Sequence, residues 1–201
     1  MKGPLIENFY RIFDWYQPAN ICEIGTHSGK SAYQMCRYLL EKGIDVNYVG
    51  YDAFELADES NHVKEHNGKG HGQMHIARQK LGSLKEKYPN FKYKLVKGFT
   101  QDTLVKKQKY DFAFIDGGHS YETVKHDYTM LEETPVIIFD DYQIEGVAQF
   151  VNELRDTYEI DTKCPRGKRK QAARIKDFAP AKDHLHVGVF KGNALGLGDL
   201  I

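Results

Sequence analysis

Two short apolar segments that each stop at an aspartate place the strongest constraint on the fold of this chain. The first covers residues 111–115 and ends at Asp116, and the second covers 136–139 and ends at Asp140 and Asp141. Short runs rich in β-branched and aromatic residues are typical of strands buried on both faces of a parallel sheet. In open α/β sheets, ligands bind just beyond the carboxyl ends of such strands. We therefore expect a ligand site at this end of the sheet.

The three aspartates also predict a bound cation. If the two strands are neighbours, Asp116, Asp140 and Asp141 converge on one small volume, where their charges repel unless a cation compensates them. Hard carboxylate oxygens suit Mg²⁺, Mn²⁺ or Ca²⁺. The alternative is that one acid caps the following helix and another is merely solvated.

Strand-like and helix-like segments alternate along the rest of the chain. Further strands are predicted over 20–25, 46–52, 91–96 and 186–190, and helices over 4–16, 28–42, about 72–87, 120–132 and 144–157. This alternation predicts an α/β fold with a doubly wound, mostly parallel sheet and helices on both faces. A length of 201 residues predicts a single domain over 1–201, with an N-terminal helix within 1–18, a lid over 53–75 and a basic loop over 163–183.

Composition argues against several classes of protein. The formal net charge is zero, so no overall basic character points to a nucleic acid or a membrane surface. No apolar run approaches the roughly 20 residues that span a bilayer, and the first residues lack a signal-peptide core. Cys22, Cys36 and Cys164 form an odd and sparse set, so we expect a reducing, cytoplasmic location.

The segment Glu23-Ile-Gly-Thr-His-Ser-Gly29 joins a predicted strand to a predicted helix. Glycines in such a turn let the backbone approach a ligand closely. The spacing is not the dinucleotide pattern Gly-x-Gly-x-x-Gly, which argues against a dehydrogenase. Glu23 suits a cationic amine better than a pyrophosphate, although it could instead serve the helix start near Ser28. Asp52 ends the next strand, where an acid can hold the hydroxyls of a ribose.

Together with the order of elements, these features resemble the class I S-adenosylmethionine-dependent methyltransferases. The resemblance implies a seven-stranded Rossmann-like methyltransferase sheet and S-adenosylmethionine (SAM) as cofactor. It implies that Glu23 and the turn from Gly25 to Gly29 meet the methionine part of SAM, that Asp52 meets the ribose, and that Gln101 and Asp102 meet the adenine. The other donor-binding residues that it implies are Thr26, Ser31, Ala53, Phe99 and Asp116.

Three further motifs narrow the resemblance to metal-dependent O-methyltransferases. Residues 97–104, Lys-Gly-Phe-Thr-Gln-Asp-Thr-Leu, look like the Gly-x-Phe-x-Asp-Thr-Leu signature of macrocin-type sugar O-methyltransferases. Residues 116–122 resemble their Asp-Gly-Asp-x-Tyr-Glu, and residues 140–142 resemble their Asp-Asp-Tyr. Gly118 replaces the second acid of the sugar enzymes, and small methyltransferases that read Asp-Gly-x-His-x-Tyr match residues 116–121 better. The similarity covers about residues 20–155.

This resemblance implies a transferase that moves a methyl group from SAM to a hydroxyl of a small acceptor, with Asp116, Asp140 and Asp141 holding Mg²⁺, Mn²⁺ or Ca²⁺. The implied acceptor is a sugar, a nucleotide sugar, a glycoconjugate or another diol. A divalent ion that holds two neighbouring oxygens fixes the acceptor and lowers its hydroxyl pKa. Together with Asp116, His119 is the catalytic candidate, as a general base or, alternatively, a structural hydrogen-bonding residue.

A histidine-rich stretch falls inside the expected lid. His62 and His66, and likewise His71 and His75, have the spacing of zinc ligands on a helix. No cysteine or well-spaced acid completes such a site, so a glycine-hinged lid is the better interpretation.

The basic segment 163–176 keeps two other functions open. It could grip phosphate in a nucleic-acid methyltransferase, or it could be a solvated loop between two late strands. The Asp-Gly-Gly-His sequence, in place of Asn/Asp-Pro-Pro-Tyr, argues against methylation of a nucleic-acid base. The remaining alternative is a non-catalytic SAM-binding module. A homodimer is compatible with all of these hypotheses.

Overall fold

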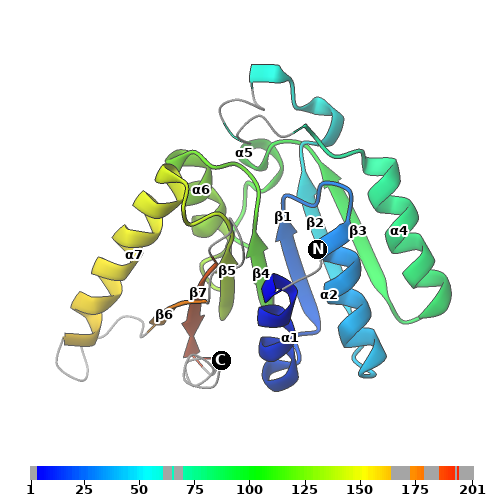
Figure 1. The fold of residues 1–201 in the computed structure, drawn as a ribbon, viewed down its shortest axis with the longest axis horizontal. Helices are drawn as coiled ribbons and strands as arrows, with labels where there is room; N and C mark the ends of the chain where they lie inside the picture. Colours follow the sequence, from blue (N-terminus) through cyan, green and yellow to red (C-terminus); the bar gives the residue numbers. More distant parts are fainter. Residues whose placement is uncertain are drawn as a thin grey trace.

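The computed structural model describes residues 4–60, 65, 70–163, 173–178, 186–192 and 194. They build one seven-stranded sheet in the order β3-β2-β1-β4-β5-β7-β6, with helices on both faces (Figure 1). Strands β1 to β5 are parallel, and β7 runs antiparallel to both β5 and β6. The predicted doubly wound, mostly parallel sheet of seven strands is confirmed.

The helices and strands have the following bounds. The strands are β1 (Asn20–Ile24), β2 (Asn47–Asp52), β3 (Lys92–Lys97), β4 (Phe112–Ile115), β5 (Val136–Phe139), β6 (Ala173–Asp177) and β7 (Val187–Lys191). The helices are α1 (Pro4–Tyr16), α2 (Lys30–Glu41), α4 (Met74–Lys87), α5 (Thr100–Thr103), α6 (Tyr121–Leu131) and α7 (Glu145–Lys163), with a 3₁₀ turn η1 (Phe54–Leu56).

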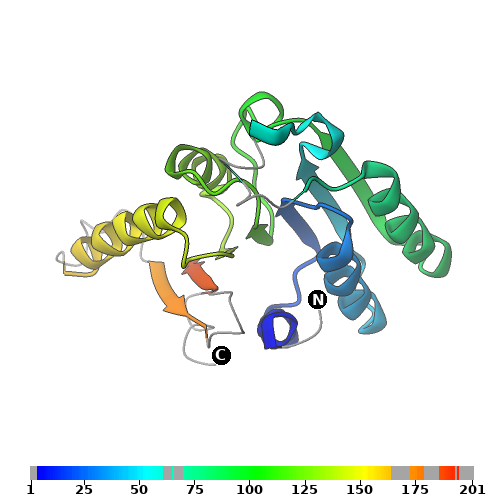
Figure 2. The ribbon, with the colours of Figure 1, turned by 45° about the horizontal axis from the view of Figure 1, so that its top comes forward.

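Two hydrophobic cores lie on opposite faces of the sheet. Helices α1, α2 and α4 contribute to one core, and α6 and α7 contribute to the other; Figure 2 shows the sheet between the two groups. Side chains alternate along β1, so Ile21 enters the first core while Cys22 and Ile24 enter the second. Because both faces are covered, β4 and β5 are apolar throughout, as the sequence indicated.

Helix α1 packs on one face of the sheet, against β4 and the start of β7. It begins at Pro4, a residue whose missing N–H costs nothing in the first helical turn. Ile6, Phe9, Ile12 and Phe13 lie on one face of the helix and are buried. The Phe9 ring contacts Phe114 of β4 edge-to-face, with ring centroids 4.9 Å apart.

The register of the central strands places their carboxyl ends at one level. Ile24 pairs with Ile115, and Ile115 pairs with Phe139. One residue further, Asp116 N donates to Ile24 O and Asp140 N donates to Ile115 O. The turn after β1 and the acids after β4 and β5 therefore leave the sheet side by side.

Four elements differ from the sequence prediction. Helix α5 and the turn η1 are short, with no apolar periodicity to reveal them. Strand β6 falls within the loop predicted over 163–183, so that prediction is wrong for residues 173–177. They pair with β7, and Ala173 and Ile175 pack against the second core. Helix α7 also extends beyond its predicted end at 157. Residues 164–172 of the basic segment lie outside the described residues.

No helix within the described part of the chain is both long enough and apolar enough to cross a bilayer.

Candidate active site

A cavity of about 480 Å³ opens at the carboxyl ends of the parallel strands. Its wall comes from the turns after β1, β2, β3 and β4, from the segment between β2 and α4, and from the end of β5. The predicted site residues that line it are Gly25, Asp52, Ala53, Phe99, Gln101, Asp116, His119 and Asp141. The cavity therefore brings part of the predicted donor-binding set and part of the acidic cluster into one volume.

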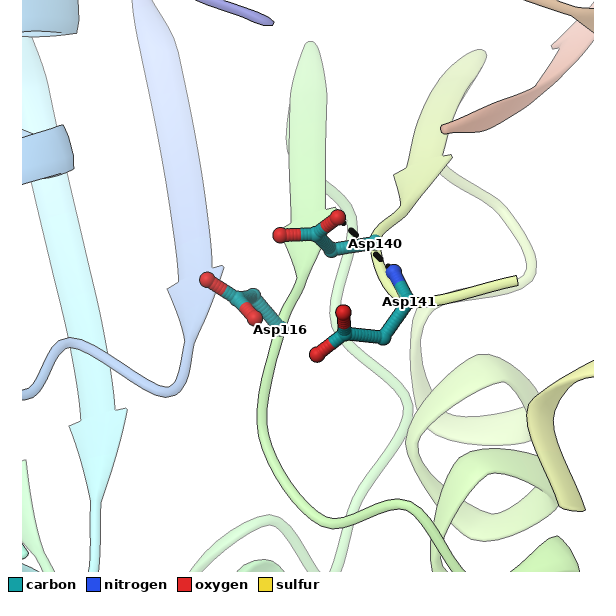
Figure 3. Close-up of side chains that lie close together, drawn as sticks. All are labelled: Asp116, Asp140 and Asp141. Carbon is teal, nitrogen blue, oxygen red and sulfur yellow. Dashed lines mark hydrogen bonds between the residues drawn. The ribbon is translucent and has the colours of Figure 1, made fainter. Parts of the chain in front are cut away.

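The three predicted metal ligands form one cluster. Asp116 follows β4, and Asp140 and Asp141 follow β5; Figure 3 shows their carboxylates gathered between the two strand ends. One ligand oxygen from each lies within 4.8 Å of the other two. Asp140 and Asp141 are buried, and Asp116 is half-buried. Three carboxylates at this spacing are costly unless a cation or protons compensate them, and all-oxygen ligation fits a hard divalent ion.

Asp141 has the most constrained backbone of the cluster. Its φ is +54°, in the left-handed region that non-glycine residues seldom adopt. Asp141 N donates to Asp140 Oδ1 at 2.7 Å, and Gln143 Nε2 donates to Asp141 Oδ1 at 2.7 Å. These contacts hold a backbone conformation that aims both carboxylates at the same place.

Two histidines contact the acids of the cluster. His119 Nε2 lies 3.0 Å from Asp141 Oδ2, and His186 Nε2 lies 3.1 Å from Asp140 Oδ1. His119 also lines the cavity, as expected for a catalytic candidate, whereas His186 is fully buried and its ring stacks on Phe9. Sequence reasoning missed His186, because only the pairing of β7 with β5 brings it to the cluster.

The turn after β1 is held tightly. Gly25 has φ +89°, and its N–H donates to Tyr51 O at 2.9 Å. Thr26 is buried, and its hydroxyl lies 3.1 Å from the Tyr48 hydroxyl. Gly29 is the N-cap of α2 with φ +70°. Of the three, Gly25 alone belongs to the cavity wall.

Glu23 lies behind this turn and not on the cavity wall. It is fully buried, and its two carboxylate oxygens accept hydrogen bonds from Ser31 Oγ and the Tyr48 hydroxyl. Burial raises the pKa of Glu23 to about 7, although both hydrogen bonds act in the opposite direction. In this structure Glu23 and Ser31 join β1, β2 and α2 beneath the turn, so a contact with the donor stays a prediction.

Asp52 joins the turns after β1 and β2 at the cavity. Its Oδ2 accepts from His27 N at 2.6 Å, and its Oδ1 accepts from Phe54 N at 2.5 Å. Both partner residues have positive φ values, +50° and +49°. Asp52 therefore fixes the turns after β1 and β2 while its carboxylate lines the cavity.

Of the two predicted adenine-binding residues, Gln101 and Asp102, only Gln101 lines the cavity, together with Phe99 from the wider set of predicted donor-binding residues. Gln101 Nε2 donates to Thr123 Oγ1 at 3.1 Å. Asp102 is exposed on α5 and is not part of the wall.

Described parts of the expected lid also reach the cavity. Glu65, Gly70, His71 and Gly72 line it, and His75 is exposed on α4. His62 and His66 lie outside the described residues. Sequence reasoning did not single out Glu65, because its contact with Ser120 joins segments 55 residues apart.

A protein-family model described as a methyltransferase domain matches residues 22–142, which is more than half of the chain. No curated protein matches the chain significantly.

Solved structures share the fold. The O-methyltransferase NovP is 16% identical with a TM-score of 0.67, and the match covers 90% of this chain and 78% of that chain. The O-methyltransferase TomG from Streptomyces achromogenes, involved in tomaymycin synthesis and solved in complex with SAM, is 16% identical with a TM-score of 0.62, covering 96% and 82%. An O-methyltransferase from Bacillus cereus in complex with SAH is 21% identical with a TM-score of 0.56, covering 95% and 82%.

Proposed function

Because the chain belongs to this family of methyltransferase domains, we propose that it transfers a methyl group from SAM to a hydroxyl of a small polyhydroxylated acceptor, a sugar or another diol. We further propose that the transfer depends on a divalent cation and that residues 1–201 form a single catalytic domain. The acceptor class rests on the resemblance of residues 97–104 and 140–142 to sugar O-methyltransferases. SAM or SAH is bound in two of the proteins with a similar fold.

One observation carries the proposal. The cavity that holds Gly25, Asp52 and Gln101 on the donor side continues to Asp116, Asp141 and His119. Methyl transfer is an in-line displacement, so donor and acceptor must share one water-poor volume with their reacting atoms aligned. A volume of about 480 Å³ lies within the usual range of small-molecule sites.

The acidic cluster fits a hard divalent ion. Asp116, Asp140 and Asp141 would hold it, since each offers an oxygen within 4.8 Å of the others. A bound Mg²⁺ ion would lower the pKa of a ligated hydroxyl and orient it. The contacts of Asp141 with Gln143 and of Asp140 with the Asp141 amide orient these carboxylates from behind.

His119 is the proposed proton acceptor. Its ring lines the cavity, and Nε2 lies 3.0 Å from Asp141 Oδ2, so the imidazole is oriented by a carboxylate. A histidine side chain can act as a general base, and the contact with Asp141 fixes the orientation of this ring beside the cavity.

The two other hypotheses receive less support. No lysine or arginine occurs among the described residues that line the cavity, which disfavours a phosphate-rich nucleic acid there. A non-catalytic SAM-binding module would have no need of three clustered carboxylates beside the donor region.

The decisive experiment measures donor binding and methyl transfer. We expect calorimetry to show SAH binding, and Asp52→Ala to weaken it at least about tenfold, because charged hydrogen bonds to the ribose hydroxyls are lost. Asp45→Asn, an exposed acid at the opposite end of β2, is the matched control and should bind SAH as the wild type does. Radiolabelled SAM with a panel of sugar and catechol diols, with and without EDTA, then tests transfer. Equal SAH affinity in the Asp52 and Asp45 variants would refute the assignment of the donor site.

A further inference from the structure

Glu65 fastens the segment after β2 to the loop after β4. Its main-chain carbonyl accepts from His119 N at 3.0 Å, and its Oε2 accepts from Ser120 N at 3.1 Å. Glu65 also lines the cavity. A residue 55 positions away in sequence from Ser120 thus places a carboxylate beside the proposed base.

Gly118 leaves the space that this carboxylate occupies. A Cβ at Gly118 would lie 2.7 Å from Glu65 Oε2 and 2.7 Å from Thr123 Cγ2. Glu65 therefore brings a carboxylate from a different segment to the place where a side chain at 118 would point.

Glu65 is the acid of the cavity wall to which the proposed function gives no role. Four acids lie on the described wall of the cavity: Asp52, Glu65, Asp116 and Asp141. No lysine or arginine occurs among the described residues of this wall. Asp52 is assigned to the donor, and Asp116 and Asp141 are assigned to the cation. Glu65 is the remaining acid, next to the loop that carries His119.

We propose that Glu65 binds the acceptor and selects it by charge, an inference that rests on the proposed function. Its carboxylate lies on the cavity wall beside the loop that carries His119, and a carboxylate can accept a hydrogen bond from an acceptor hydroxyl or ammonium group. The same charge repels a carboxylate or phosphate near the reactive diol. The substrate class is thus a neutral or cationic diol, such as a free or amino sugar, and not a nucleotide sugar.

Three catechols that share one diol and differ in charge test this selection: dopamine, catechol and 3,4-dihydroxybenzoate. We expect the wild type to prefer dopamine, and Glu65→Gln to raise kcat/KM for the benzoate relative to dopamine by about tenfold, equivalent to about 1.4 kcal/mol. Glu59→Gln, an exposed acid of the same segment, should leave this ratio unchanged. A purely structural role would lower kcat/KM for all three compounds equally, because it would not depend on their charge.

A relocated acid provides the complementary test. The triple variant Glu65→Ala, Gly118→Asp, Thr123→Ser places a carboxylate on the loop itself and removes the methyl group that a side chain at 118 would meet. We expect it to restore the preference for dopamine that Glu65→Ala with Thr123→Ser loses, with SAH affinity showing that each variant is folded.

The outcomes separate the two proposals. Wild-type transfer with the same charge ratio in the Glu65→Gln and Glu59→Gln variants would overturn the role of Glu65 alone. A wild type that binds SAH and methylates none of the three catechols or the sugar diols would overturn the proposed function, and this inference with it.

Discussion

Among single residues, Asp127 of α6 is a buried carboxyl group outside the acidic cluster. It is fully buried, and neither oxygen has a hydrogen-bond partner in good geometry, although Thr100 lies close enough to favour the ionised form. Burial, together with a smaller contribution from the charge of Glu65, raises the pKa of Asp127 to about 7. The folded protein therefore keeps this proton over a range where the unfolded chain has lost it.

The raised pKa predicts a pH-dependent stability. Between about pH 4 and pH 7 the folded state binds the proton and the unfolded state does not, so the free energy of unfolding falls as pH rises through this window. Glu23, raised to about 7 as well, adds to the same slope. Asp127→Asn keeps a neutral group there. We expect it to match the wild type near pH 4 and to exceed it at pH 8 by on the order of 3 kcal/mol.

Urea unfolding in EDTA at pH 4, 6 and 8 measures this effect. Glu122→Gln, an exposed acid on the same helix, should follow the wild-type slope. A difference between Asp127→Asn and wild type that stays constant from pH 4 to pH 8 would contradict the assignment.

At the scale of elements, the turn between β1 and α2 depends on the close approach of two backbones. A Cβ at Gly25 would lie 1.9 Å from Asp116 O and 2.5 Å from Asp116 C, and neither backbone atom can move without shifting the end of β4. Gly43, after α2, has a similar φ of +81° but no atom within 4 Å of its Cβ position. Both glycines have a left-handed backbone that would strain any other residue. Only at Gly25 would an added side chain also collide with a neighbour.

This pair predicts two different outcomes. Gly43→Ala should cost about 1 kcal/mol of folding free energy and leave SAH affinity within about twofold, because only the left-handed backbone penalty applies. Gly25→Ala should cost about 3 kcal/mol or more and abolish measurable SAH binding, because the turn must move away from β4. Denaturant unfolding and calorimetry measure both. Similar losses in the two variants would show that strain, and not collision, dominates at Gly25.

At the scale of the whole molecule, the acidic cluster joins the ends of β4 and β5, so ion binding should be visible in global stability. A ligand at 100 times its Kd stabilises a protein by about 2.7 kcal/mol. For a chain of this length we expect Mg²⁺ to raise the Tm by roughly 5–10 °C. In Asp140→Asn the shift should nearly vanish, while the Tm in EDTA should rise, because one of three like charges is gone.

Differential scanning calorimetry with and without Mg²⁺ gives this comparison, and Asp45→Asn should retain the full wild-type shift. Equal Mg²⁺ shifts in the Asp140 and Asp45 variants would remove the cluster as the ion site.

Sequence by itself determined the alternation of strands and helices along the chain. It also determined that the three aspartates lie at one edge of the sheet, after the strands that precede them. Those properties follow from local apolar patterns, and from the rule that parallel strands end at one edge. Helix α5 escaped prediction because it is a single short turn, and strand β6 because its pairing with β7 stabilises it and no continuous apolar run marks it.

Only the tertiary structure decided which side chains join the acids. Glu65 and Ser120 are 55 residues apart, and His186 reaches Asp140 through the pairing of β7 with β5. Likewise, the partners of Glu23 come from β2 and α2, which place its carboxylate behind the turn. Contacts of this kind depend on the packing of whole elements, and no local pattern encodes them. The sequence could thus predict the acids of the site, and the fold alone brings together the groups that surround them.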